Sequence, residues 1–289
     1  MDAPPPPCVL RLREKIRRCT LCPRDCGVDR AAGEVGSCGC GAEALVASAG
    51  AHFGEEAVLV GRGGSGTIFL AGCNLHCLFC QNYDISQMRH GRPASPAAIA
   101  AAALSLERGG CENINFVTPT HLAHAVAEAV WLARRGGLTV PVVYNCGGYE
   151  AVETLRLLEG LVEIYMPDFK YADPAAGRKY SGVDDYPQVA EAALAEMYRQ
   201  VGPLRTDPRG VATRGVLVRH LVMPGDLARS RDVLDAVARA APACAINVMG
   251  QYRPEYRAEE FPELLARPAP AEVSALRRRA ESLGLVRVD

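Results

Sequence analysis

The sequence predicts an α/β fold, a partial (β/α)6 barrel preceded by a small cysteine-rich N-terminal module. Six short apolar runs rich in β-branched residues recur along the chain, and Ala- and Leu-rich segments with helical spacing separate them. The first sixty residues lack this alternation. We therefore expect three parts: a metal-binding module over 1–60, a barrel core over 61–255 and a helical C-terminal extension over 256–289.

The predicted strands follow a Gly-rich segment at 61–66. Six β units joined by helices imply a parallel sheet with right-handed crossovers, and six are too few for a closed eight-stranded barrel. A doubly wound open sheet is the alternative, and in either fold the functional site lies at the carboxyl ends of the strands. The strands are expected at 67–71, 113–117, 140–145, 162–167, 215–222 and 244–249.

The predicted helices alternate with these strands. The clearest start is at Ser95, an N-cap residue followed by Pro96 at the first helical position. The other helices rest on Ala- and Leu-rich composition at helical spacing. Together they are expected at 96–107, 121–135, 149–158, 187–201, 226–240 and 270–283.

The charge balance argues against strong electrostatic attraction to nucleic acid or to a membrane surface. The 289-residue chain has a formal net charge of −1, with 49% hydrophobic and 22% charged residues. No apolar run approaches the ~20 residues of a membrane span, and the first residues lack the continuous apolar stretch of a secretory signal. We expect a cytoplasmic protein with neither a membrane nor a nucleic-acid partner.

Eight of the twelve cysteines fall in two groups, between 19 and 40 and between 73 and 80. In a reducing cytosol such groups are more often metal ligands than disulfides. Cys111, Cys146 and Cys244 stand alone in or beside apolar runs, where a free thiol packs as a small hydrophobe. The two groups are therefore candidate metal sites, and the three isolated cysteines are expected in the core.

The most informative stretch is 66–86, GTIFLAGCNLHCLFCQNYDIS, in which a strand runs into a loop with Cys73, Cys77 and Cys80. Three thiolates cannot complete a four-cysteine zinc site, but they can hold three irons of a [4Fe–4S] cluster and leave the fourth open. S-Adenosylmethionine (SAM) can chelate an open iron through its amino and carboxylate groups. The alternative is a zinc site completed by His76, His90 or a distant cysteine.

In these residues the chain resembles the radical SAM superfamily and, within it, proteins similar to the pyruvate formate-lyase activating enzyme. The resemblance covers roughly residues 15–255 and includes the cysteine loop, HFGEE, NINFVTPTH, YMPDFKY and VRHLVMPG. It implies a [4Fe–4S] cluster that cleaves SAM reductively to methionine and a 5′-deoxyadenosyl radical. It further implies an electron donor such as flavodoxin or ferredoxin, and hydrogen abstraction from a protein or peptide substrate.

The resemblance also suggests where SAM binds, because the family contacts follow the strand ends. The Gly-Gly-Glu segment usual after the second strand is replaced by VTPTH, in which Thr118 or Thr120 can contact the cofactor. Asn145 ends the third strand and is expected to bond the ribose or the carboxylate. After the fourth strand, Lys170 can pair with the SAM carboxylate, and Asp168 can orient Lys170 or touch substrate.

Four further residues lie on or directly after the last two strands of the core. Arg219 is expected to face the barrel interior and a carboxylate, because a cation in a buried strand needs a partner. His220 points to the other face by strand alternation and is expected to be a packed core histidine. Gln251 and Tyr252 follow the sixth strand and are expected to line the site.

The N-terminal cysteine group predicts a second metal site. Its candidate ligands are Cys19, Cys22, Cys26 and Cys38, with glycines after Cys26 and Cys38 that let backbone amides turn toward thiolates. A structural zinc site and an auxiliary iron–sulfur cluster both fit this pattern. The third possibility is a set of loose cysteines in a disordered segment.

Three functions compete on the sequence alone. The first is an activase-like radical SAM enzyme that abstracts hydrogen from a protein partner. The second is radical modification of a small molecule or peptide, and the third is a non-catalytic iron–sulfur or zinc protein used for redox sensing or as a scaffold. Turnover of SAM to 5′-deoxyadenosine separates the first two from the third.

Overall fold

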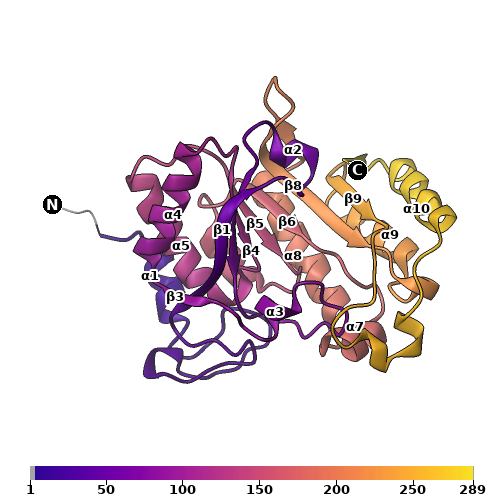
Figure 1. The fold of residues 1–289 in the computed structure, drawn as a ribbon, viewed down its shortest axis with the longest axis horizontal. Coiled ribbons are helices and arrows are strands. Elements are labelled where there is room, and N and C mark those ends of the chain that lie inside the picture. The colour runs from indigo at the N-terminus through magenta and orange to yellow at the C-terminus, as the bar shows by residue number, and fades with distance from the viewer. Residues whose placement is uncertain (1–3, 289) are drawn as a thin grey trace.

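Ten strands form one sheet in the computed structural model, which describes residues 4–288. Their order is β10-β9-β8-β6-β5-β4-β2-β1-β3, with β7 paired to β8 off this path (Figure 1). The end strands β3 and β10 pair only with β1 and β9, so the sheet is open, as a partial barrel requires. The strands are β1 (Ala44–His52), β2 (Ser65–Leu70), β3 (Arg92–Ala94), β4 (Ile114–Val117), β5 (Val142–Cys146), β6 (Ile164–Pro167), β7 (Arg205–Thr206), β8 (Ala212–Leu221), β9 (Ala245–Met249) and β10 (Val286–Arg287).

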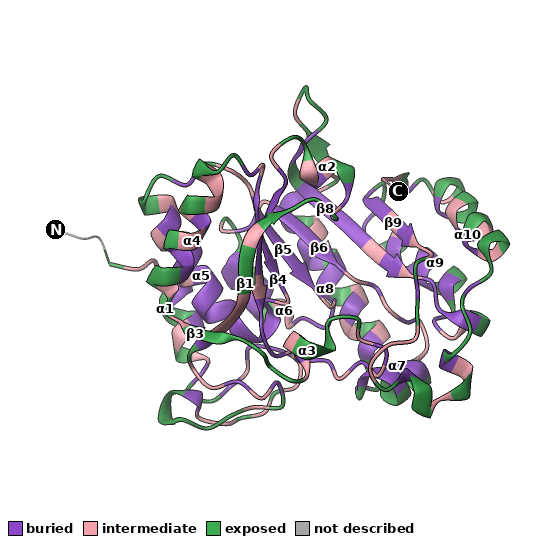
Figure 2. Cartoon of the chain, in the orientation of Figure 1, coloured by how far each residue is buried: buried purple, intermediate pink, exposed green. Residues whose placement is uncertain are grey.

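The six predicted strands are confirmed as β2, β4, β5, β6, β8 and β9, each parallel to the next. The register places Ile68, Phe116, Tyr144 and Tyr165 side by side across four of them, and all four are buried. Strands β4, β5 and β6 are buried at every position, as expected where both faces of a parallel sheet are covered (Figure 2). The partial α/β barrel is therefore confirmed.

Helices link the parallel strands, and all six predicted helices are present. The N-cap at Ser95 is confirmed, because its hydroxyl accepts a hydrogen bond from Ala98 N at 3.2 Å. Helix α7 was not predicted from the sequence. It contains Gly177, and glycine lowers the helix propensity of the segment. In residues 4–288 none of the helices has the length and apolar character needed to cross a bilayer. The linking helices are α4 (Pro96–Arg108), α5 (Ala123–Arg135), α6 (Val152–Leu158), α7 (Pro174–Ser181), α8 (Tyr186–Val201), α9 (Ser230–Ala240) and α10 (Pro270–Ser282).

The first sixty residues contribute a strand that the sequence analysis did not predict. β1 pairs antiparallel with β2 on one side and with β3 on the other. Its sequence, ALVASAGAH, consists mainly of small residues with weak strand preference, so no strand pattern was visible. Helix α1 (Pro7–Glu14) contacts α5 through Arg13, whose Nε donates to Glu128 at 2.6 Å. Strand β1 thus belongs to the same sheet as the core strands, and the predicted domain boundary near residue 60 stays a prediction.

Candidate active site

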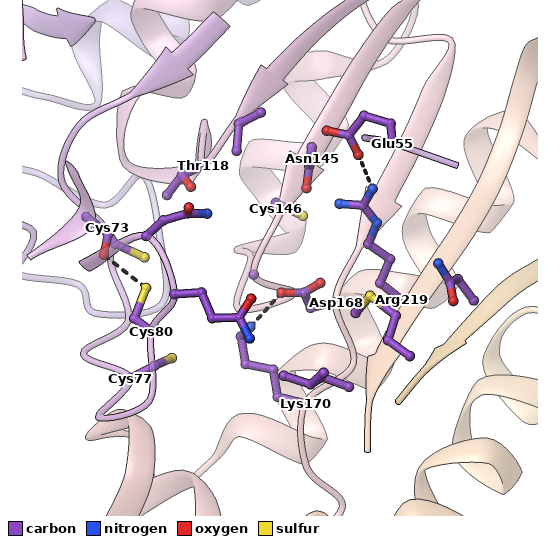
Figure 3. Close-up of a pocket in the computed structure, with 18 of the residues that line it drawn as sticks. Glu55, Cys73, Cys77, Cys80, Thr118, Asn145, Cys146, Asp168, Lys170 and Arg219 are labelled. Carbon is purple, nitrogen blue, oxygen red and sulfur yellow. Dashed lines mark hydrogen bonds and ion pairs between the residues drawn. The ribbon is translucent and has the colours of Figure 1, made fainter. Parts of the chain in front are cut away.

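A cavity of about 700 Å³ lies at the carboxyl ends of the parallel strands (Figure 3). The loop after β2 forms one wall and carries Cys73, Cys77 and Cys80. The ends of β4, β5 and β6 form a second wall, to which Asp168 contributes, and Arg219 of β8 closes the cavity on its far side. The parallel topology thus brings together residues that are far apart in the sequence.

Each cysteine of the loop after β2 has a polar group beside its sulfur. One is a backbone amide and two are serine hydroxyls, all of which can donate to a thiolate. Such donors favour sulfur in its anionic form. The contacts join Leu75 N to Cys73 Sγ at 3.4 Å, Ser181 Oγ to Cys77 Sγ at 3.0 Å and Ser86 Oγ to Cys80 Sγ at 3.2 Å.

Aromatic packing and a side-chain amide fix the same loop against the core. Phe79 is buried, with its ring centroid 6.4 Å from that of Tyr171 and 5.9 Å from that of Tyr252. Asn74 donates through Nδ2 to Tyr149 O at 2.7 Å. These contacts hold the cysteine loop to the segments after β5, β6 and β9, so the three sulfurs keep a defined position against the cavity.

An ion pair after β6 lines the cavity together with the cysteine loop. Lys170 Nζ lies 2.5 Å from Asp168 Oδ2, and both side chains are mostly buried. Burial lowers the pKa of Lys170, but the carboxylate of Asp168 outweighs this and holds that pKa well above its usual value. Burial raises the pKa of the Cys73 and Cys77 thiols, although Lys170 opposes this, and a bound cation would stabilise both as thiolates.

A second ionic network occupies the far side of the cavity. Arg219 donates through Nε to Glu56 Oε1 at 2.8 Å, and its Nη2 contacts carboxylate oxygens of both Glu55 and Glu56. Asn247 Nδ2 adds a bond of 2.9 Å to Glu56 Oε1. Burial raises the pKa of Glu56, but Arg219 more than offsets this, so the pKa stays below its usual value. The expectation that Arg219 faces a carboxylate is confirmed.

Residues 67–202, which contain the cysteine loop, match the family model described as Radical SAM superfamily. An uncharacterized protein of Methanocaldococcus jannaschii is 32% identical over 281 residues, which are 93% of this chain and 76% of that relative. This chain belongs to the radical SAM superfamily.

Membership in the radical SAM superfamily implies a [4Fe–4S] cluster and SAM, and the residues of the cavity fit both groups. In the described chain no three His, Cys, Asp or Glu side chains converge on the position of one metal ion. The cysteines of a [4Fe–4S] cluster bind separate irons, so the spread of Cys73, Cys77 and Cys80 along one wall suits it. When bound, the two groups supply one-electron cleavage of SAM and hydrogen-atom abstraction.

The radical SAM core separates the two predicted threonines. Thr118 lines the cavity, has a left-handed backbone with φ of 61°, and donates its N–H to Asn145 O at 2.8 Å. Thr120 is buried behind the wall, and its Oγ1 donates to Glu150 at 2.5 Å. Burial raises the pKa of Glu150 to about 7. Of the two threonines, only Thr118 lies in a position to meet a ligand of the cavity.

Of the residues predicted around the last two strands, His220 and Gln251 take up the expected environments, whereas the prediction that Tyr252 lines the site is wrong. His220 is buried, with Nδ1 2.7 Å from Phe169 O and Nε2 2.9 Å from Ser230 Oγ, which confirms it as a core histidine. Gln251 lines the cavity and is exposed. Tyr252 does not line it but packs beneath the cysteine loop.

All twelve cysteines of this radical SAM chain are free thiols. Cys111, Cys146 and Cys244 are buried as predicted, although Cys146 also lines the cavity. The four predicted N-terminal ligands lie outside the cavity; three are buried, and Cys26 is half-buried. These are Cys19, Cys22, Cys26 and Cys38.

Sequence reasoning missed Glu55 and Glu56, the two carboxylates that pair with Arg219. They belong to HFGEE, a segment noted only as part of the family resemblance. The available signal was indirect: a buried Arg219 requires a carboxylate, and this pair of adjacent glutamates precedes the first barrel strand. Nothing in the sequence joined the two observations, because the contact spans 163 positions.

Proposed function

We propose that this radical SAM enzyme abstracts hydrogen from a residue of a protein or peptide, in the manner of glycyl-radical activating enzymes. The observation that carries the proposal is an exposed rim on an open barrel. Gln81, Asn82 and Gln251 line the cavity and are exposed, while β3 and β10 leave the sheet unclosed. Such a rim lets a polypeptide loop approach the strand ends.

An aromatic pair beside this rim supports a polypeptide substrate. Tyr83 follows Asn82 directly and stacks on Tyr256, with ring centroids 5.1 Å apart and planes inclined by 17°. Partly exposed tyrosines offer apolar area together with a hydroxyl, the combination that protein interfaces favour. A loop bound across this pair would lead into the cavity.

The proposed roles follow from the contacts around the cavity. Cys73, Cys77 and Cys80 would hold the cluster. Lys170 would meet the carboxylate of SAM, with Asp168 orienting its ammonium group, while Asn145 and Thr118 offer polar groups to the rest of the cofactor. Arg219 is held on the far wall by its ion pairs with Glu55 and Glu56, and from there it would contact the cofactor.

Two features of the cellular setting belong to the same proposal. Reductive cleavage of SAM consumes one electron, so we expect an electron donor such as flavodoxin or ferredoxin. A cytoplasmic location is consistent with a chain whose twelve cysteines are all free.

The first experiment asks whether the cysteine loop holds the cluster. Replacing Cys73, Cys77 and Cys80 together with Ala should remove about four irons per chain and abolish 5′-deoxyadenosine formation by the anaerobically reduced protein. Cys244→Ala, a buried cysteine outside both groups, is the matched control and should keep both. Full iron content and SAM cleavage in the triple variant would show that the cluster lies elsewhere.

The second experiment addresses the substrate. Reduced enzyme, SAM and a candidate glycyl-radical enzyme are incubated without oxygen, and the electron paramagnetic resonance spectrum is recorded. A glycyl doublet that requires active enzyme supports activation. Stoichiometric deoxyadenosine formation with a small metabolite, and no radical on any protein partner, would assign the enzyme to small-molecule chemistry instead.

A further inference from the structure

The N-terminal cysteines lie on two loops that touch each other. Gly27 N donates to Cys19 O at 3.1 Å and closes the loop 19–27. Ser37 N donates to Cys26 Sγ at 3.3 Å, which joins the turn before Cys38 to this loop. The loop 19–27 and the turn 36–39, which between them carry the four predicted ligands, are therefore in direct contact.

A buried cation borders these cysteines. Arg30 is 1% exposed and donates through Nη1 to His121 O at 2.7 Å and through Nε to Gly41 O at 2.9 Å. Its Nη1 also lies 3.8 Å from Cys19 Sγ. Elsewhere in residues 4–288 the buried Arg219 has two carboxylates, whereas no Asp or Glu forms an ion pair with Arg30. A buried guanidinium without an anion is costly.

The neighbouring polar groups do not supply the missing negative charge. His121 and His124 are buried, and burial lowers the pKa of each imidazole to about 4, so both rings are neutral. Their Nε2 atoms donate to main-chain carbonyls, and their Nδ1 atoms have no partner among the described groups. The nearest groups able to become anions are the thiols of the two loops.

We propose that Cys19, Cys22, Cys26 and Cys38 bind a metal centre through four thiolates, with Arg30 as its buried counter-cation. A zinc ion or an oxidised iron–sulfur cluster with four thiolates carries a net charge of about −2, so a guanidinium beside it is stabilising. In the described chain the sulfurs do not yet converge on one point. A zinc ion would draw the four sulfurs together, whereas a cluster would bind them further apart. Gly27 and Gly39 both have positive φ, and their conformational freedom would let the two loops adjust.

The position of this centre gives it a role at the active site. Arg24 lies between Cys22 and Cys26 and donates through Nε to Asn74 O at 2.8 Å and through Nη1 to Gly182 O at 2.7 Å. Asn74 is the residue after Cys73, so Arg24 holds the loop that carries the radical SAM cluster. A metal that fixes the 19–27 loop would fix Arg24 and thereby the cluster loop.

The test uses the full chain with Cys73, Cys77 and Cys80 replaced by Ala, so that any remaining metal belongs to the N-terminal centre and the result does not depend on SAM turnover. Elemental analysis should find about one zinc per chain, or residual iron with matching sulfide. Adding Cys22→Ser or Cys26→Ser should remove it. Cys8→Ala is the control and should keep it, because Cys8 lies on helix α1, outside both loops.

Arg30 is tested in the same background. Arg30→Met should weaken metal binding about 10- to 100-fold in competition with a chelator, and Arg30→Lys should restore most of it, because charge rather than packing is the proposed cause. Circular dichroism confirms that each variant is folded. Folded background protein with neither zinc nor iron and sulfide, or unchanged metal content after Cys22→Ser and Cys26→Ser, would overturn the proposal.

Discussion

The ionic network around Arg219 allows a quantitative test of how the cavity is built. Replacing Arg219 with Met keeps much of the side-chain length and removes the cation. The side chains of Glu55 and Glu56 are only 7% and 3% exposed, so both carboxylates would stay buried without their partner. Removing one partner of a buried ion pair costs about 3–5 kcal/mol. At about 2–4 °C per kcal/mol for a large domain, Tm should fall by about 6–20 °C.

This loss of stability should depend on pH in a defined direction. In the native protein the pKa of Glu56 is lowered, so the group contributes stability above the unfolded value of about 4.3 and loses it as the pH falls through the folded pKa. Without Arg219, burial raises the pKa of Glu56. The variant then loses stability as the pH rises through that raised pKa. The gap in Tm between native and variant protein should therefore narrow from about pH 8 to about pH 5.

Thermal unfolding followed by circular dichroism at both pH values measures the effect. Arg214→Met is the matched control, since Arg214 lies on the same strand, is exposed and donates to Gln200 O at 2.6 Å. Its loss should cost at most about 1.5 kcal/mol at either pH. Adding Glu56→Gln to Arg219→Met should recover part of the loss. If the Tm of Arg219→Met equals that of the native protein, or if the difference in Tm is the same at both pH values, the argument is refuted.

Two further predictions concern the cofactor and a buried acid. Lys170→Met and Asn145→Ala should keep the iron but bind SAM about 10- to 150-fold more weakly in equilibrium dialysis, because each loses a hydrogen bond to a charged group of roughly 1.5–3 kcal/mol. Unchanged affinity in both would contradict their assignment. Burial raises the pKa of Glu150 to about 7, so its contribution to stability is complete below about pH 4.3 and is lost as the pH rises through about 7. Glu150→Gln should flatten this part of the dependence of Tm on pH, and an unchanged slope would exclude Glu150 as its source.

The parallel core could be predicted because its strands carry a strong physical signal. Strands β4, β5 and β6 are buried at every position, and such strands are short apolar runs that stand out between helices. β1 gave no such signal, since the small residues of ALVASAGAH gain little from packing on a sheet. Connection rules predicted that these strands are parallel, whereas no rule predicted the antiparallel edge.

The cysteine loop was predictable because its three cysteines, the proposed cluster ligands, are local in sequence. The positions of Thr118 and Thr120 were not, because a left-handed turn at Thr118 decides which side chain meets the cavity. The partners of Arg219 could not be predicted from the sequence either, because only the three-dimensional fold brings Glu55 and Glu56 into contact with it.

The long separation of Glu56 from Arg219 also bears on biosynthesis. At about 5–20 residues per second, the ribosome adds Arg219 about 8–33 s after Glu56, because 163 positions lie between them. During that interval the emerging N-terminal segment lacks the strands that bury it, and Arg30 lacks His121, its acceptor 91 positions later. The loops that carry the cysteines at 19–40 therefore emerge well before the segments around His121 and Gly182 that contact them. Until those segments follow, the thiols of these loops are expected to stay open to metal ions and to oxidants.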